Sequence, residues 1–246
     1  MTSARLPLFP LNSVLFPGLV LPLNVFEERY RAMMRALLAQ DASEPRLFAV
    51  VAIRDGQEVA PTLPGLPDPT ALPERGAAAG FGDDPMKVFH PVGCVADAAT
   101  VREREDGGFE VIATGTTRVR LLSVDTGGPY LTAELEEIPE EPGQDAGALA
   151  EGVLRAFRSY QKRLAGARER TLTTGAEVPD DPSVISYLVA SAAVLDVPAK
   201  QRLLEASDTA TRLREELRLL RTETAVLKHL PSVPMVHLTQ TPTHPN

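Results

Sequence analysis

The sequence is short of cysteine, of net positive charge and of long apolar runs, and each shortage excludes a class of protein. Among 246 residues there is one cysteine, Cys94, which excludes an internal disulfide framework and a multi-cysteine zinc site. Because 33 acidic residues outnumber 25 basic ones, the net charge is -8 and offers no global positive field to a phosphate backbone. We therefore expect a protein of a reducing compartment that does not bind nucleic acid.

Apolar runs long enough for membrane insertion are also missing. Residues 184–195 form the most apolar window beyond the N-terminal region, but they fall short of the about 20 residues that a spanning helix needs. Prolines interrupt the apolar residues near the start, and no small-residue cleavage pattern follows them. The sequence thus predicts a cytoplasmic protein without a signal peptide and without membrane contact.

The common catalytic signatures are absent. There is no G-x-S-x-G elbow and no H-E-x-x-H helix. A GK[ST] phosphate loop is excluded because no lysine follows a glycine; the lysines are Lys87, Lys162, Lys200 and Lys228. No metal-ligand spacing joins the histidines, which are His90, His229, His237 and His244. We expect no catalytic residue, no metal and no cofactor.

The stretch LPLFPLNSVLFPGLVLPLNVFEERY, residues 6–30, is crowded with apolar residues and prolines. Proline has no amide donor, so the prolines limit these residues to short, bent or edge strands. Pro17 and Gly18 suit the two central positions of a type II turn. From residue 27 the apolar spacing becomes helical and predicts an amphipathic helix over 27–39.

The middle of the chain returns to a strand pattern. Residues 46–53 predict a buried strand, and the Pro- and Gly-rich residues 61–85 predict a long loop. Residues 88–138 contain four strand-like segments with turn signals at 106–108 and 127–129, which predicts an antiparallel meander of four strands.

Helical patterns follow a change of composition at residues 139–147. They cover 149–164, a segment that begins at Asp181-Pro182, residues 196–206, and a last helix capped by Asp208. We predict an α+β fold with a β-rich domain over 1–140, a half-barrel of short antiparallel strands with one helix. An α-helical domain over 146–230 and a disordered tail over 231–246 complete the prediction.

Several of these segments resemble one known family. The N-terminal substrate-binding domain of the Lon protease family is similar to this chain in four segments: the opening stretch, GCVADAATV, GTTRVRL and Pro129-Tyr130. The helical segment that follows this domain in the family is similar to two further segments, DDPSVISYLVAS and DVPAKQRLLEASDTATRLREEL. The resemblance implies a PUA-like β-fold that binds polypeptide. It also implies a free-standing recognition domain that works without ATP, because the ATPase and serine-lysine protease motifs are missing.

Surplus apolar residues in the opening stretch predict a peptide-binding groove, because not all of them can face inward on short strands. The groove residues that we predict are Phe9, Phe16, Pro17 and Leu19, covered by Leu63, Leu66 and Phe81 of the long loop. The family-like residues are expected to be mainly structural: Pro17, Gly18, Pro22, Phe26, Glu27, Arg29 and Tyr30.

Three functions stay open at this point. The first is a non-enzymatic module that binds unfolded or extended polypeptide, as an adaptor in protein quality control or with a protease or chaperone as partner. The second is a hydrolase with an unrecognised site, which a cleft with converging carboxylates or a Cys94–His90 pair would support. The third is RNA or nucleotide binding by the PUA-like barrel, which would require a basic stripe through Arg102, Arg104, Arg118 and Arg120. Oligomeric state is not predicted.

Overall fold

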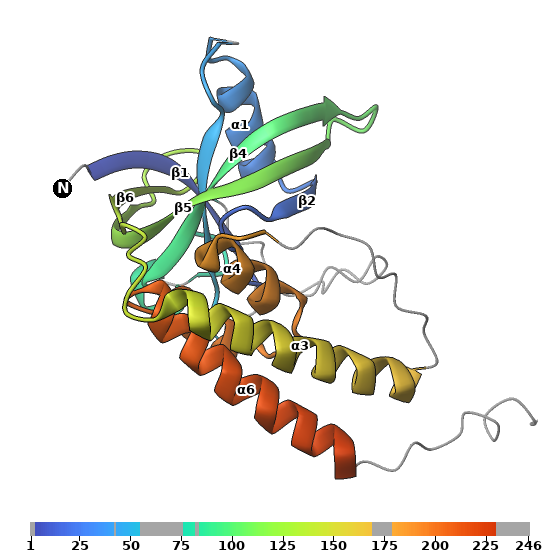
Figure 1. The fold of residues 1–246 in the computed structure, drawn as a ribbon. Helices are drawn as coiled ribbons and strands as arrows, with labels where there is room; N and C mark the ends of the chain where they lie inside the picture. The colour runs from blue at the N-terminus through green and yellow to red at the C-terminus, as the bar shows by residue number, and fades with distance from the viewer. Residues whose placement is uncertain (1–2, 42, 55–75, 82–83, 169–178, 230–246) are drawn as a thin grey trace, which may run out of the picture.

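The computed structural model describes residues 3–41, 43–54, 76–81, 84–168 and 179–229 (Figure 1). Its strands are β1 (Ser3–Leu11), β2 (Val20–Val25), β3 (Leu47–Ala52), β4 (Val92–Glu103), β5 (Phe109–Asp125) and β6 (Thr132–Glu137). Its helices are α1 (Glu28–Leu38), α2 (Pro85–Val88), α3 (Ala146–Arg168), α4 (Pro182–Ala192), α5 (Val197–Leu204) and α6 (Thr209–His229). Residues 61–75 and 82–83 of the predicted loop and the predicted tail over 231–246 lie outside the described residues.

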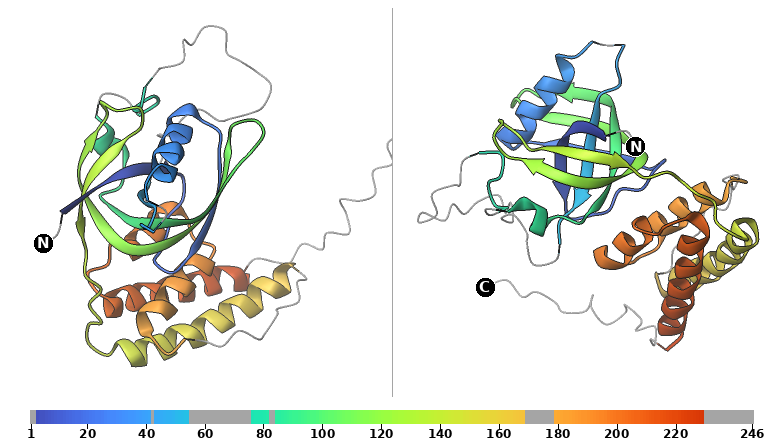
Figure 2. Two further views of the ribbon diagram at one scale, coloured as in Figure 1. Left: turned by 90° about the horizontal axis from the view of Figure 1, so that it is seen from above. Right: turned by 90° about the vertical axis from the view of Figure 1, so that its left-hand side faces the viewer.

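We call the part with the strands, residues 3–138, the β lobe, and α3 to α6 the helical lobe. The prediction of an α+β chain with strands first and helices second is confirmed. The helical lobe packs at one end of the β lobe (Figures 1 and 2). Among the described helices, none has the length and apolar character to span a membrane.

The sheet closes on itself. The strand order is β2-β5-β4-β3-β1-β6. An additional pairing of β5 with β6 closes the five strands from β5 to β6 into a ring, and β2 is paired to β5 outside this ring. The predicted half-barrel is therefore a closed barrel with one appended strand (Figure 2). One pairing, β1 with β3, is parallel, whereas the prediction had only antiparallel pairs.

Residues 88–138 form three strands instead of the predicted four. The segments on either side of Gly115 belong to one 17-residue strand, β5, whose first half pairs with β2 and whose second half pairs with β6. A side chain at Gly115 would begin 2.4 Å from the carbonyl oxygen of Phe16, so glycine marks a close approach of two main chains here. A glycine of this kind is a turn signal in the sequence although the strand continues through it.

The opening stretch contains the turn that the sequence predicts. Gly18 has φ 77°, and the Leu19 amide donates to the Phe16 carbonyl at 3.2 Å, as in a type II turn with Pro17 first. Pro22 lies inside β2, at an edge of the sheet where an amide donor is not required.

We expect Gly18→Ala to lower the free energy of unfolding by about 1 kcal/mol, because a Cβ is unfavourable at positive φ even where space is free. Beyond its chain neighbours, no atom of the described residues lies within 4 Å of the Cβ position at Gly18, so the cost is conformational. The matched control is Gly152→Ala in α3, where the Cβ position is equally open and the backbone is helical. Urea denaturation of both variants should show a loss for the first and a gain of about 0.5–1 kcal/mol for the second.

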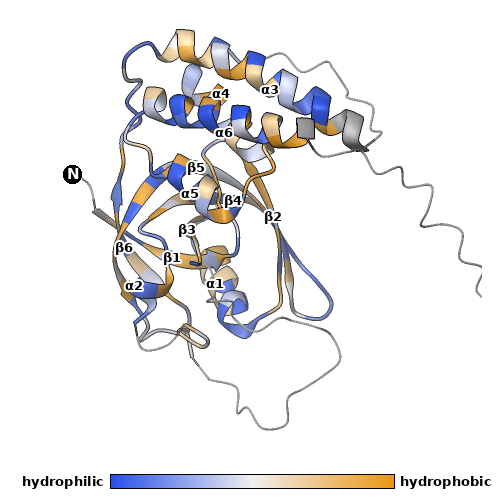
Figure 3. Ribbon diagram, turned by 90° about the horizontal axis from the view of Figure 1, so that it is seen from below, coloured by the Kyte–Doolittle hydropathy of each residue, from blue (hydrophilic) through white to orange (hydrophobic). Residues whose placement is uncertain are grey.

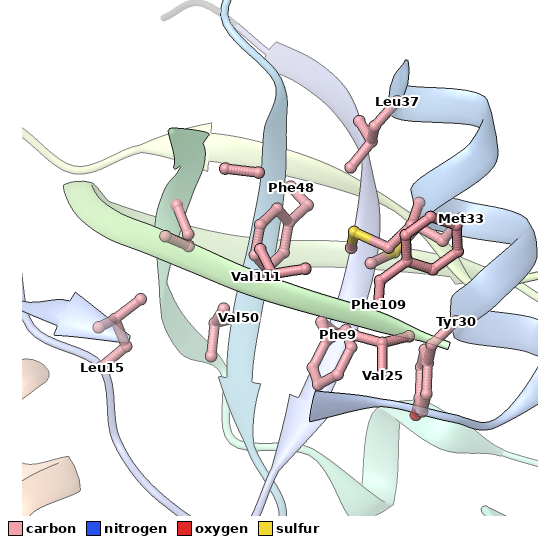
Figure 4. Packing of buried hydrophobic residues seen from close by; sticks show 14 of the residues in the cluster. Phe9, Leu15, Val25, Tyr30, Met33, Leu37, Phe48, Val50, Phe109 and Val111 are labelled. Carbon is pink, nitrogen blue, oxygen red and sulfur yellow. The ribbon is translucent and has the colours of Figure 1, made fainter. Parts of the chain in front are cut away.

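Two apolar cores fill the β lobe. One lies between α1 and the sheet and includes Phe9, Tyr30, Met33 and Phe48 (Figure 4). The other lies on the opposite side of β1 and β3, around Phe81 and Phe89, whose rings meet edge to face at 4.9 Å. The amphipathic helix predicted over 27–39 is confirmed as α1, and its apolar face closes the first core.

The two lobes are joined by an apolar cluster and by buried charges. Phe16 and Val92 of the β lobe pack with Tyr187 and Leu203 of the helical lobe. Beside them Arg118 of β5 forms an ion pair with Glu140 at 3.1 Å, and Arg212 of α6 pairs with the same carboxylate. We call this polar group the interlobe cluster. The separation into two domains stays a prediction; the contacts show that the lobes share buried side chains.

Candidate functional site

A pocket of about 210 Å³ opens where β1, β2 and α1 meet. Its floor is apolar and its rim carries amide and carboxylate groups, so it can hold an apolar side chain and hydrogen-bond the chain that bears it. Drug-sized ligands occupy larger pockets, and this volume suits one or two side chains. The lining residues are Phe9, Pro10, Leu11, Asn12, Leu23, Asn24, Val25, Phe26, Glu27, Arg29, Tyr30, Ile53 and Phe81. We call this the β2–α1 pocket.

Arg29 fixes one wall of the pocket. Its guanidinium donates to the carbonyls of Ala77 and Ala79, at 3.3 and 2.6 Å, and pairs with Glu27 at 2.7 Å. It also lies over the rings of Tyr30 and Phe81, 4.8 and 5.0 Å from their centroids. A single side chain thus ties residues 76–81 to the start of α1.

Tyr30 and Phe9 form the floor. Their ring centroids are 4.3 Å apart, and both rings belong to the core beneath α1 (Figure 4). Burial raises the pKa of Tyr30 well above its ordinary value, so its hydroxyl stays neutral. The floor is therefore rigid and uncharged.

The rim carries an exposed apolar surface. Phe26 is 57% exposed, and Val20 on the outer face of β2 is 61% exposed. Ile112 on β5, opposite Pro22, is 44% exposed and extends this surface across the sheet. Of these three side chains Phe26 lines the pocket, so it is the exposed apolar contact that the rim offers to a ligand.

The pocket also lies along a free strand edge. Among the described strands β2 pairs only with β5, and no β5 residue lines the pocket, so the pocket is on the side of β2 that no described strand pairs with. The Gly115 amide donates to the Leu19 carbonyl at 2.9 Å. Along an antiparallel strand the residues alternate between bonding their partner strand and pointing away from it, so the amides of Val20 and Asn24 point to the free edge. Pro22 has the same orientation but no amide proton. An extended chain has main-chain partners there.

The structure separates the groove residues that the sequence predicts together. Phe9 and Phe81 line the β2–α1 pocket. Phe16 is 1% exposed and lies in the interlobe contact, with its ring centroid 6.0 Å from that of Tyr187. Pro17 and Leu19 are half-buried near that contact, and Leu63 and Leu66 lie outside the described residues.

Four family-like residues line the pocket: Phe26, Glu27, Arg29 and Tyr30. The structural role predicted for Arg29 and Tyr30 stays a prediction, and their contacts shape the pocket wall as well. Phe26 as an exposed rim residue is missing from the predicted groove. In the structure exposed and half-buried residues alternate along β2 before Val25, but the sequence VLPLNVF has no matching apolar and polar alternation that would mark Phe26 as an outer-face residue.

A hydrolytic site at Cys94 has no support in the geometry. Cys94 is fully buried, its thiol donates to the Val95 carbonyl, and burial raises the pKa of the thiol to about 12. His90 is oriented toward Glu205, with Nδ1 3.8 Å from a carboxylate oxygen. Over the described ranges, no cluster of three or more metal-ligating side chains occurs.

The arginines considered for nucleic acid do not form an exposed stripe. Arg118 is 2% exposed and contacts main-chain carbonyls of the helical lobe. Arg120 lies near Glu136, at 3.6 Å, and Arg104 near Asp106, at 3.2 Å. Arg102 and Arg104 are confined to the tip of the β4–β5 hairpin.

Comparison with known proteins gives a consistent set of relatives. The family model of the ATP-dependent protease La (LON) substrate-binding domain matches residues 5–222. Lon protease 2 of Herpetosiphon aurantiacus is 28% identical over 233 residues, which are 92% of this chain and 25% of that protein. Lon protease 2 of Sorangium cellulosum is 28% identical over 90% of this chain and 25% of its own length. The chain spans about a quarter of the length of the curated relatives it matches.

Solved structures share the fold. The N-terminal domain of Mycobacterium avium complex Lon protease matches with a TM-score of 0.57 and 20% identity, over 92% of this chain and 100% of that chain. A Lon N-terminal domain protein from Xanthomonas campestris matches with a TM-score of 0.56 and 21% identity, over 87% of this chain and 98% of that chain.

Proposed function

Because this chain belongs to the family of the ATP-dependent protease La (LON) substrate-binding domain, we propose that it binds extended polypeptide at the β2–α1 pocket without chemically changing it. The observation that carries the proposal is the position of an apolar pocket along the unpaired edge of β2, with Phe26 exposed on its rim. An extended chain would lie beside β2, accept and donate main-chain hydrogen bonds there, and insert one apolar side chain into the pocket.

The charges at the pocket define the chain that it would accept. Glu27 is paired with Arg29, and the remaining polar groups on the rim are the neutral amides of Asn12 and Asn24. A neutral rim does not select a charged ligand, so recognition would depend on extended conformation and apolar content. Unfolded segments have both properties, whereas a folded protein hides them.

We further propose that the bound polypeptide is passed to, or shared with, a protease or chaperone, and that the protein acts as an adaptor in the cytoplasm. The curated relatives are Lon proteases of which this chain matches about a quarter. A recognition module of this family supplies contacts to a substrate, and a separate ATP-dependent module would supply unfolding and cleavage.

The experiment compares wild type with Phe26→Ser in binding to reduced, carboxymethylated lactalbumin, an unfolded polypeptide, by fluorescence anisotropy. We expect the substitution to weaken binding about tenfold, because it removes the large exposed ring from the rim. Native lactalbumin should bind neither protein detectably.

The matched control is Val194→Ser, which removes an apolar side chain that is 55% exposed on the helical lobe. Circular dichroism should show that both variants fold, since both side chains are solvent-exposed. Equal binding by wild type and Phe26→Ser, or an equal loss in the two variants, would remove the β2–α1 pocket from the proposal.

A further inference from the structure

A second concave surface lies on the helical lobe, between α3 and α6. These two helices run side by side away from the β lobe (Figures 1 and 3). The hollow between them has a volume of about 500 Å³. On each helix the lining residues recur at steps of three and four, so one face of each helix contributes: positions 152, 155, 156, 159 and 163 of α3, and positions 217, 220, 221, 224 and 225 of α6. We call this the α3–α6 groove.

The floor of the groove is low and is formed by small and apolar residues. On α3 it is formed by Gly152, Ala156 and Ser159, all of them small. The Cβ position at Gly152 meets no atom within 4 Å, so the main chain of α3 is open to close approach. On α6 the floor is formed by Leu217 and Leu220. Small residues facing leucines are the surface on which another helix packs closely.

The rim of the groove is basic. Arg155 and Arg163 of α3 and Arg221 of α6 line it and are exposed. Among the described residues Arg155 pairs with Glu151 alone, at 3.6 Å and with both side chains well exposed, which is a weak interaction. Within the part of the chain that the structure describes, Arg163 and Arg221 have no ion-pair partner. A patch with three arginines is unexpected on a chain of net charge -8.

We propose that the α3–α6 groove binds an acidic amphipathic helix of a partner protein. Apolar residues of that helix would lie on the floor, and its carboxylates would pair with Arg155, Arg163 and Arg221. The α3 lining runs over eleven residue steps, from Gly152 to Arg163. At about 1.5 Å per residue this is about 17 Å, which accommodates about three turns of helix.

A nucleic-acid strand fits the same surface less well. Binding to a phosphate backbone depends on many cations spread along the strand, and this groove offers three around an apolar floor. The floor would remain exposed beside a strand of phosphates, whereas an amphipathic helix covers it. The proposal concerns a different surface from the β2–α1 pocket and does not depend on polypeptide binding there.

The test uses a fluorescein-labelled synthetic helix of about 14 residues, with leucine at every third or fourth position and glutamate on both flanks of that stripe. Wild-type protein is expected to bind it in the micromolar range. Raising the salt from about 0.1 M to about 1 M shortens the screening length from about 10 Å to about 3 Å and should weaken binding. The double variant Arg163→Glu/Arg221→Glu should bind at least about tenfold more weakly.

The matched control is Arg102→Glu/Arg104→Glu on the β4–β5 hairpin, which changes the net charge by the same amount and should bind as wild type does. A steric variant, Ser159→Trp, places a large side chain on the floor and should weaken binding without any change of charge. Equal weakening by the two charge doubles would overturn the proposal, because it would reveal a response to net charge alone. Tighter binding of a single-stranded oligonucleotide than of the peptide would also overturn it.

Discussion

Replacing Arg118 by methionine is expected to lower the free energy of unfolding by about 2–6 kcal/mol, because two carbonyls would each lose a donor at a cost of about 1–3 kcal/mol. Arg118 is 2% exposed and donates to the carbonyls of Leu204, at 3.0 Å, and Ala206, at 2.6 Å. It also pairs with Glu140 at 3.1 Å. Methionine has a similar length but no donor, so the carbonyls of Leu204 and Ala206 would lose their partner, whereas Glu140 would keep Arg212.

The control for this substitution lies two residues further along β5. Arg120→Met removes a side chain that is 52% exposed and whose carboxylate partner, Glu136, is 3.6 Å away. An exposed pair of this kind contributes about 0–1 kcal/mol. Urea denaturation should be followed by circular dichroism and by tyrosine fluorescence, since Tyr187 hydrogen-bonds Glu140 inside the interlobe cluster. Equal losses in the two variants would contradict the role of Arg118 in joining the lobes.

The second large expected effect is a loss of folding stability as pH rises, and its cause is Glu216. Its side chain lies at the back of the interlobe cluster and is 2% exposed. The Ser186 hydroxyl donates to one carboxyl oxygen at 2.6 Å, and the other oxygen has no hydrogen-bond partner among the described residues. Burial raises the pKa of Glu216 from 4.5 to about 8, against the opposing effects of Ser186 and Arg212.

A carboxyl whose pKa is raised by folding binds more protons in the folded state than in the unfolded state between the two pKa values. The contribution of Glu216 to the free energy of unfolding is therefore fully present below pH 4.5 and is lost as pH rises through about 8. The total is about 3–5 kcal/mol at about 1.36 kcal/mol per pKa unit. Glu216→Gln keeps an acceptor for Ser186 and cannot ionise, so the stability of wild type relative to this variant should fall steadily between pH 5 and pH 9.

The neighbouring Glu215 supplies a control of opposite sign. Hydrogen bonds from Arg218 hold the pKa of Glu215 below its usual value, so its stabilising effect is present at neutral pH and lost in acid. Glu215→Gln should leave the alkaline part of the stability profile unchanged. If wild type and Glu216→Gln gave parallel profiles between pH 5 and pH 9, Glu216 would not be the buried proton-binding group.

Local features of the fold could be predicted from the sequence because their causes are local. Pro17 and Gly18 form their turn through their own backbone preferences. Asp181 caps α4 by accepting from the Ser183 amide at 2.7 Å, as Asp before Pro indicates. The helical periods of α1, α3, α5 and α6 likewise depend on residues a few positions apart.

Features that depend on distant partners could not be predicted in this way. Phe16 looks like a surplus apolar residue until Tyr187 of α4 is placed against it. Arg118 looks like a surface cation because its partners are main-chain carbonyls of Leu204 and Ala206, which no sequence pattern marks as acceptors. The parallel β1–β3 pair and the closure of β5 on β6 also depend on contacts between distant segments.

The β2–α1 pocket combines features that could be predicted from the sequence with features that could not. Phe9, Arg29 and Tyr30 were marked by the opening stretch, and the structure brings them together. Ile53 and the 76–81 segment join them from other parts of the chain, and only the fold shows that β2 has an unpaired edge beside them. The residues could be chosen from the sequence, but the shape of the surface could not.

The most direct test of the central claim is amide hydrogen exchange, with and without reduced, carboxymethylated lactalbumin, resolved along residues 18–30. Added main-chain hydrogen bonds at the β2 edge should slow exchange at the amides of Val20 and Asn24, which point away from β5. Protection should be centred on β2 and the start of α1, and it should be weaker in Phe26→Ser. Binding that protects other segments and leaves β2 unchanged would contradict polypeptide recognition at this pocket.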